Sequence, residues 1–84
     1  MADFHLQIYT QEKKVFEGAV TSIIAPGEDG YFGVLASHAP LVGVLGAGKL
    51  TIRQGSQTTE RELSGGFLEV HANQAVILAD SLSG

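Results

Sequence analysis

The chain has 84 residues, a formal net charge of −4 and no cysteine. This length gives room for one domain, residues 1–84, with an adequate but not generous core. Five basic residues cannot form the cationic face that nucleic-acid binding requires, and without cysteine there are no disulfides, thiolate metal sites or cysteine nucleophiles. We expect no signal peptide and no membrane span, so the sequence predicts a soluble intracellular protein that reaches a membrane only through another protein.

Alternation of apolar and polar residues is the dominant pattern. Phe4, Leu6 and Ile8 alternate with polar neighbours, which predicts a strand with one buried face. Turn residues then recur about every 8–12 positions, and no window shows the helical period. The sequence therefore predicts an all-β fold, an antiparallel sandwich or barrel. Further strands are expected over residues 18–25, 31–35, 41–45, 50–53, 57–63, 67–70 and 75–79.

The segment from Pro26 to Val42 contains two turns and a short apolar strand. Pro26 fixes φ and Gly27 accepts a positive φ, so we expect a tight turn at this pair. Glu28 and Asp29 are adjacent, so their carboxylates diverge on a turn and do not pair for acid–base chemistry. They form either a solvated turn or a docking site for a basic partner. With so few catalytic groups nearby, the segment indicates a docking surface.

Three other patterns in the chain contain residue types that occur in reaction sites. The run from Gly43 to Lys49 resembles a phosphate-binding loop, but Leu50 stands where that motif needs Ser or Thr, and residues 50–53 alternate like a strand. The histidines at positions 5, 38 and 71 have no metal-ligand spacing. A triad of Ser37, His38 and Asp80 lacks the context of a nucleophile elbow.

We therefore expect no catalytic residue, no metal and no cofactor. Glu69 interrupts an apolar strand, and alternation favours a surface position over a paired, half-buried one.

Several motifs together resemble the epsilon subunit of bacterial ATP synthase, the delta subunit of mitochondria, in its N-terminal β-sandwich domain. The resemblance covers about residues 4–82, and no segment of this chain corresponds to the C-terminal helical hairpin that family members usually carry. Roles of that hairpin in inhibition or ATP binding are therefore not transferred. The matching segments are Phe16–Gly18, Pro26–Gly30, Gly33–Leu35, His38–Leu41, Gly48, Leu63–Val70, Asn73 and Val76–Asp80.

The resemblance implies a sandwich of about ten strands that serves as a non-catalytic rotor subunit in the central stalk. Such a domain links the gamma subunit to the membrane c-ring and supports the coupling of ion translocation to ATP synthesis. By position, Glu28, Asp29, Gly30 and Tyr31 would meet polar loops of the c-ring. His38, Ala39, Pro40, Leu41 and Val42 would lie at the gamma interface. The location implied is peripheral, at the cytoplasmic face of the cell inner membrane.

Two other functions remain open on the sequence. One is a regulatory module in which the sandwich itself inhibits ATP hydrolysis. The other is a free-standing β-domain that binds or hydrolyses a small ligand, for which a pocket lined by His5, His38 or His71 would be required. The spacing of these histidines predicts no such pocket.

Overall fold

The computed structural model describes residues 2–83, and in this range the chain forms strands joined by turns and loops. No helix in the described range could cross a bilayer. The ten strands are β1 (Phe4–Tyr9), β2 (Lys14–Val20), β3 (Ser22–Gly27), β4 (Gly30–Leu35), β5 (Leu41–Leu45), β6 (Gly48–Gln54), β7 (Gln57–Leu63), β8 (Gly66–His71), β9 (Gln74–Ala79) and β10 (Leu82–Ser83).

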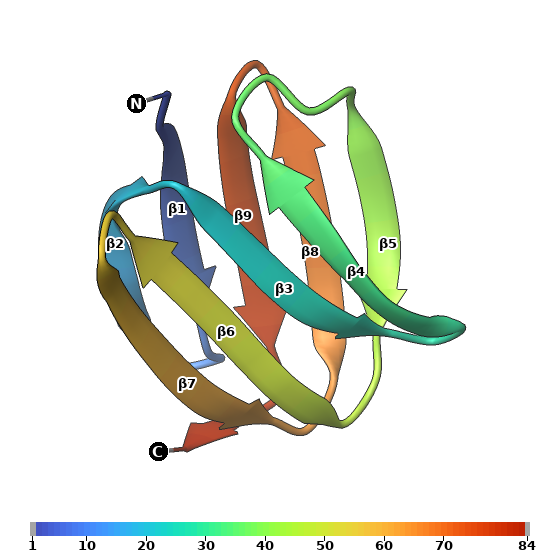
Figure 1. The fold of residues 1–84 in the computed structure, drawn as a ribbon. Coiled ribbons are helices and arrows are strands. Elements are labelled where there is room, and N and C mark those ends of the chain that lie inside the picture. Colours follow the sequence, from blue (N-terminus) through green and yellow to red (C-terminus); the bar gives the residue numbers. More distant parts are fainter. Residues whose placement is uncertain (1, 84) are drawn as a thin grey trace.

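The strands follow one hydrogen-bonded path in the order β10-β7-β6-β3-β5-β8-β9-β1-β2, and β4 pairs with β3 outside that path. Figure 1 shows β3, β4, β6 and β7 crossing in front of β1, β9, β8 and β5, which gives two packed layers. The predicted all-β sandwich is confirmed. One pair departs from the antiparallel pattern: β1 lies parallel to β9. This pairing brings a strand near the N-terminus beside a strand near the C-terminus.

The core is built from the inward-facing residues of both layers. On β8 the pattern is strictly alternating, with Leu68 fully buried and Val70 nearly so while Phe67 and Glu69 face outward. Each buried Leu, Ile or Val contributes about 1.5–3 kcal/mol relative to its exposed state. The described residues include no buried polar or charged side chain. The interior is therefore apolar throughout and offers no chemistry to a substrate.

Two predicted elements are shifted in the structure. The strand expected over residues 18–25 is divided at Thr21, where the chain leaves β1 and joins β4 and β6. Thr21 donates to the Arg53 carbonyl oxygen from its backbone N–H at 2.8 Å and from its hydroxyl at 3.0 Å, which fixes this crossing. The tight turn was expected at Pro26 and Gly27, and this is wrong. Both residues belong to β3, because their partners on β4 continue the ladder.

Tight turns join the predicted strands 50–53 and 57–63, and 67–70 and 75–79. Gly55 has a φ of 64° in the β6–β7 hairpin, and Ala72 and Asn73 have φ values of 52° and 60° between β8 and β9. Two consecutive positive φ angles are typical of a tight turn whose twist matches the flanking strands. The glycine-rich run before Lys49 leads into β6 and not into a helix, so the phosphate-loop alternative fails on structure as it did on sequence.

Candidate docking surfaces

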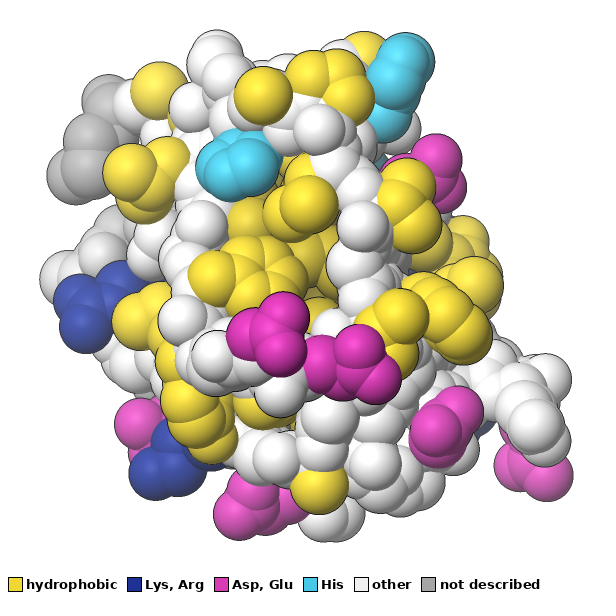
Figure 2. All heavy atoms as spheres, turned by 90° about the vertical axis from the view of Figure 1, so that its right-hand side faces the viewer, with side chains coloured by type: hydrophobic (Ala, Val, Ile, Leu, Met, Phe, Trp, Pro, Cys, Tyr) yellow, Lys and Arg dark blue, Asp and Glu magenta, His cyan; other side chains and the backbone are white. Residues whose placement is uncertain are grey.

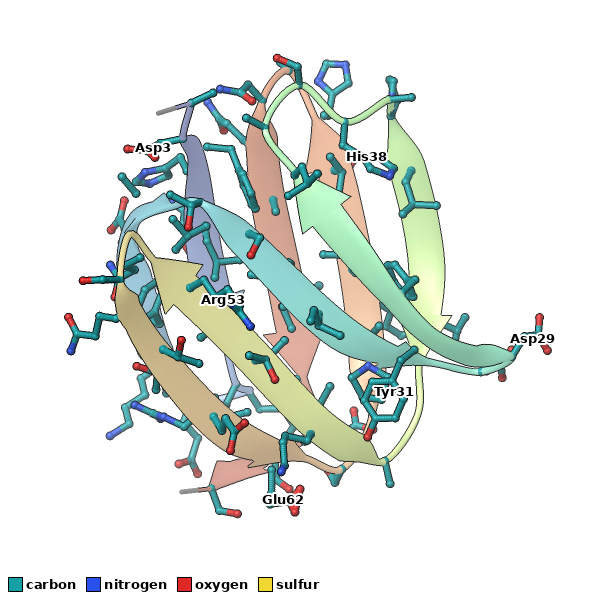
Figure 3. The ribbon with its side chains drawn as sticks, viewed as in Figure 1. Asp3, Asp29, Tyr31, His38, Arg53 and Glu62 are labelled. Carbon is teal, nitrogen blue, oxygen red and sulfur yellow. The ribbon has the colours of Figure 1, made fainter. Side chains whose placement is uncertain are left out.

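The acidic turn, defined here as Glu28 and Asp29, connects β3 to β4 at one end of the sandwich. Gly30 follows it with a φ of 132°, a conformation open to glycine and costly for residues with a Cβ. Figure 3 shows Asp29 at the tip of this hairpin, pointing away from the body. Both acidic residues are exposed, and neither has an ion-pair partner within residues 2–83. Two negative charges thus project from a short, shaped turn.

Backbone hydrogen bonds tie this turn to the end of β5. The Glu28 N–H donates to the Val44 carbonyl oxygen at 3.3 Å, and the Gly46 N–H donates to the Pro26 carbonyl oxygen at 2.8 Å. A hollow of about 430 Å³ lies beside the turn, with apolar groups from Phe32 and Leu41 in its lining. Figure 2 views this side of the molecule and shows acidic side chains next to an apolar hollow. The carboxylates therefore form the rim of a concave apolar surface.

The second predicted segment, His38 to Val42, lies at the opposite end of β4, as the labelled side chains of Asp29 and His38 show in Figure 3. Its loop is held by the Ser37 N–H, which donates to Asn73 Oδ1 at 2.7 Å, and by the His38 N–H, which donates to the Leu35 carbonyl oxygen at 3.2 Å. The structure therefore does not bring the two predicted groups together. It places them at the two opposite ends of β4.

The members of the His38–Val42 segment face in different directions. Leu41 is partly buried and packs against the core, whereas Val42 is 74% exposed. His38 is partly buried, and its Nδ1 lies 2.7 Å from the Ala39 carbonyl oxygen. The loop and the first residue of β5 thus present their surface through Ala39, Pro40 and Val42, while Leu41 anchors them.

An exposed apolar face continues from Val42 across three strands. It consists of Val42 and Val44 on β5, Phe67 on β8 and Leu78 on β9. In register, Val44 pairs with Phe67, and Phe67 pairs with Leu78. Phe67 is 55% exposed and Leu78 is 53% exposed, beside a shallow hollow of about 300 Å³. The exposed Glu69, which pairs with Val42, borders these side chains on β8. An exposed apolar surface of this kind is a candidate interaction site.

Sequence reasoning missed the part of this face contributed by Val44, Phe67 and Leu78. A usable signal was present, since β5 and β9 are apolar at almost every position and do not alternate. In such a strand one face packs into the core, and the apolar residues on the other face are typically covered by a second packing element. Which of the two faces is left uncovered, however, depends on how the sheets pack.

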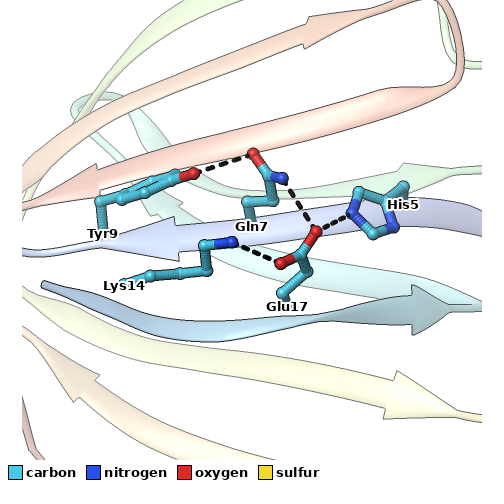
Figure 4. A network of polar contacts seen from close by, with 5 residues as sticks. All are labelled: His5, Gln7, Tyr9, Lys14 and Glu17. Atoms are coloured by element: carbon cyan, nitrogen blue, oxygen red, sulfur yellow. Dashed lines mark hydrogen bonds and ion pairs between the residues drawn. The ribbon is translucent and has the colours of Figure 1, made fainter.

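The same sheet carries a polar network on β1 and β2, shown in Figure 4. Glu17 Oε1 accepts a hydrogen bond from Lys14 Nζ at 2.5 Å, and Glu17 Oε2 accepts one from Gln7 Nε2 at 3.1 Å. His5 Nε2 lies 2.8 Å from the same Oε2 atom. The hydrogen bond from Lys14, followed by those from Gln7 and His5, holds the pKa of Glu17 at about 2. The hydrogen bond to Glu17 in turn raises the pKa of Lys14. The polar groups of this network are therefore hydrogen-bonded to one another at the surface.

The structure assembles none of the reaction sites considered from the sequence. Within residues 2–83, no three metal-ligating side chains gather. Ser37 is bonded to Asn73 at one end of β9, and Asp80 follows the other end. Six strand residues separate these ends by about 20 Å, so the Ser37–His38–Asp80 triad does not form. Glu69 is exposed, as alternation predicts.

The fold defines a β-sandwich domain, and its exposed acidic turn and apolar face are candidate docking surfaces. Residues 3–83 match the family described as the β-sandwich domain of the ATP synthase delta/epsilon chain, and the chain belongs to this family. The predicted resemblance to ATP synthase epsilon is thereby confirmed, and epsilon is a non-catalytic stalk subunit of the enzyme.

Individual relatives agree with the family assignment. The ATP synthase epsilon chain of Moorella thermoacetica is 48% identical over 82 residues, covering 96% of this chain and 61% of the relative. That of Chlorobium limicola is 41% identical over 81 residues, covering 95% of this chain and 92% of the relative. The chain thus spans about three fifths of the length of the first relative and nearly all of the second.

Solved structures show the same architecture. A chain of the Euglena gracilis mitochondrial ATP synthase, in a structure of OSCP, F1 and the c-ring, superposes with a TM-score of 0.91 at 26% identity. The match covers 98% of this chain and 53% of that one. A chain of the Tetrahymena thermophila central stalk and c-ring superposes with a TM-score of 0.79 at 24% identity, and this likeness concerns the fold alone.

Proposed function

We propose that this chain, residues 1–84, is a rotor domain that joins the gamma subunit to the c-ring of a bacterial-type ATP synthase. The single observation that carries the proposal is the family match over residues 3–83. Its role is adhesive and mechanical: the domain strengthens the joint between stalk and ring so that ion translocation remains coupled to ATP synthesis. It works at the cytoplasmic face of the cell inner membrane, held there by the complex.

The c-ring contact is proposed for Glu28, Asp29, Gly30 and Tyr31. Two exposed, unpaired carboxylates on a hydrogen-bonded turn support this assignment. Such charges give orientation and partner choice when they face basic or amide groups. Because the turn is tied to β5 through backbone atoms, its charges are presented at a fixed position, and a torque-bearing joint needs that fixity.

The gamma contact is proposed for His38, Ala39, Pro40, Leu41 and Val42, extended by the exposed apolar face on β5, β8 and β9. The core of a protein interface is depleted in charged residues and enriched in aromatic ones, and Phe67 stands in the middle of this face. A standard interface needs about 800 Å² on each partner. The loop and the apolar face are continuous through Val42 and together offer a surface for such a contact.

Calorimetric titration with purified gamma subunit tests the stalk assignment. We expect saturable one-to-one binding that weakens when His38 and Leu41 are both replaced by alanine. Because Leu41 also packs on the core, a Val42→Ala variant, which alters an exposed side chain, is measured in parallel. Unaltered binding by both variants would move the gamma contact elsewhere on the sandwich, and no binding by the parent chain would contradict the rotor function.

The c-ring assignment is tested separately with the Glu28→Ala/Asp29→Ala double variant in the assembled enzyme. We expect proton-driven ATP synthesis to fall while the ATPase activity of the detached soluble part is unchanged. Normal synthesis by this variant would remove the acidic turn from the coupling contact.

A further inference from the structure

Tyr31 makes a contact within the chain that its sequence position does not suggest. Its side chain is 60% exposed, yet its hydroxyl oxygen accepts a hydrogen bond from the Lys49 backbone N–H at 3.0 Å. Figure 3 shows Tyr31 reaching from the base of the β3–β4 hairpin toward the start of β6. One side chain thus connects the strand after the acidic turn to a strand that is distant in sequence.

Gly48 leaves the space that this contact requires. A Cβ at position 48 would lie 2.6 Å from the Tyr31 hydroxyl oxygen and 2.8 Å from Pro26 Cβ. Real Cβ atoms do not approach other atoms so closely, so the phenol can lie across β6 only where position 48 has no side chain. Pro26 is the cross-strand partner of Tyr31, and the three residues therefore pack at one place.

The acidic turn is consequently held from two sides. The Val44 carbonyl oxygen and the Gly46 N–H bind its strands on the β5 side. On the β6 side, the connection is the hydrogen bond between Tyr31 and Lys49. A two-residue turn held on one side alone can swing about its base, and a second attachment on the other side opposes that motion.

We propose that Tyr31, which packs against Gly48, is a positioning residue that fixes the direction of Glu28 and Asp29 toward the c-ring. Its hydroxyl acts inside the chain, and its exposed ring forms part of the surface beside the turn. This inference rests on the proposed c-ring contact, and it assigns to Tyr31 a structural task distinct from the charges it orients.

The first test uses the 84-residue chain alone and measures the turn directly. We compare ¹⁵N relaxation at the amides of residues 28–30, and the amide shift of Lys49, in the parent, Tyr31→Phe and Gly48→Ala chains. The Tyr31→Phe change removes one oxygen and cannot by itself collapse the fold. We expect the Lys49 resonance to move and the turn amides to become more mobile on the ps–ns timescale in both variants. Gly18→Ala is the matched control, because a Cβ there meets only ordinary contacts, the nearest at 3.7 Å.

The second test measures binding to purified c-rings in nanodiscs. Tyr31→Phe is expected to weaken binding about fivefold, which corresponds to the loss of one hydrogen bond, and Gly48→Ala about tenfold or more. Because both changes disrupt the hydrogen bond between Tyr31 and Lys49, the double variant should lose less affinity than the product of the two single losses. Gly18→Ala should bind as the parent does.

The outcomes separate this inference from the proposed function. Turn amides that stay as rigid in Tyr31→Phe as in the parent would overturn it, as would mobile turn amides with unchanged c-ring affinity. If the parent chain does not bind c-rings, the proposed c-ring contact fails, and the relaxation data alone then decide whether Tyr31 fixes the turn. Mobile turn amides together with weaker binding would support the inference.

Discussion

The outer surface of the sheet formed by β5, β8, β9, β1 and β2 divides into two unlike halves. On β1 and β2, the side chains of His5, Gln7, Lys14 and Glu17 bind one another at the surface. On β5, β8 and β9, the exposed apolar face contains Phe67 and its neighbours, which have no such partners in the described chain. On β1, β8 and β9 alike, inward-facing and outward-facing side chains alternate. The polar half is satisfied by its own hydrogen bonds and by water, whereas the apolar half is the part that the proposed gamma contact would cover.

The largest expected effect is a difference in the free energy of unfolding between variants at inward-facing and outward-facing positions of β8. Replacing Leu68, which is fully buried, by alanine should lower the free energy of unfolding by about 2–5 kcal/mol because it leaves a cavity. Phe67→Ala on the same strand should cost about 1 kcal/mol or less, since its side chain is half exposed in the isolated chain. Urea denaturation of both variants measures this. Equal losses would mean that Phe67 belongs to the core and not to a docking surface.

The next effect concerns binding by the apolar half. Phe67→Ser should weaken gamma binding about 30-fold, or ~2 kcal/mol, as expected for an aromatic residue at the centre of an interface. Ile24→Ser, which removes another exposed apolar side chain from β3, is the matched control and should change affinity less than about threefold. Calorimetric titration compares the two. A greater loss for Ile24 would relocate the interface to the opposite layer.

A smaller effect tests how the two halves are joined at one end. Asn73 accepts from the Ser37 N–H at 2.7 Å and donates to the Asp3 carbonyl oxygen at 3.0 Å, with a φ of 60°. Asn73→Ala should lower stability by about 1–2 kcal/mol, from lost hydrogen bonds and backbone strain. Asn73→Gly relieves the strain and should cost less.

Thermal melting distinguishes the two Asn73 variants, with a shift of about 4–8 °C for each kcal/mol. If the alanine and glycine variants melt alike, the positive φ carries no strain and only the hydrogen bonds matter.

The smallest effect belongs to the polar half and depends on pH. The pKa of Glu17 is lowered from 4.5 to about 2 in the folded chain, so its contribution to stability is present above pH 4.5 and is lost as the pH falls toward 2. Glu17→Gln removes this contribution, and the difference in urea midpoint between parent and variant should shrink over that window. A gap that stays constant down to pH 2 would contradict the network.

The fold could be predicted because local chemistry dictates it. The alternation at Phe4, Leu6 and Ile8 is visible in the chain, and so is the turn at Gly55. The residues at which β2 and β3 begin and end could not be predicted from the sequence. Pro26 and Gly27 resemble a turn in sequence, yet cross-strand pairing with Tyr31 and Gly30 keeps them in β3. The division at Thr21 likewise arises from a long-range bond to Arg53.

By itself, the sequence determined the all-β class, the positions of most strands and the exposed acidic pair of Glu28 and Asp29, because each depends on residues close together in the chain. The tertiary structure alone decided which apolar side chains remain outside. Val44, Phe67 and Leu78 form one face only through the pairing of β5, β8 and β9. It also decided that Tyr31 reaches Gly48 and Lys49, since that contact exists only where the β3–β4 hairpin crosses the start of β6. Contacts between distant segments depend on strand pairing, and residue types alone do not encode it.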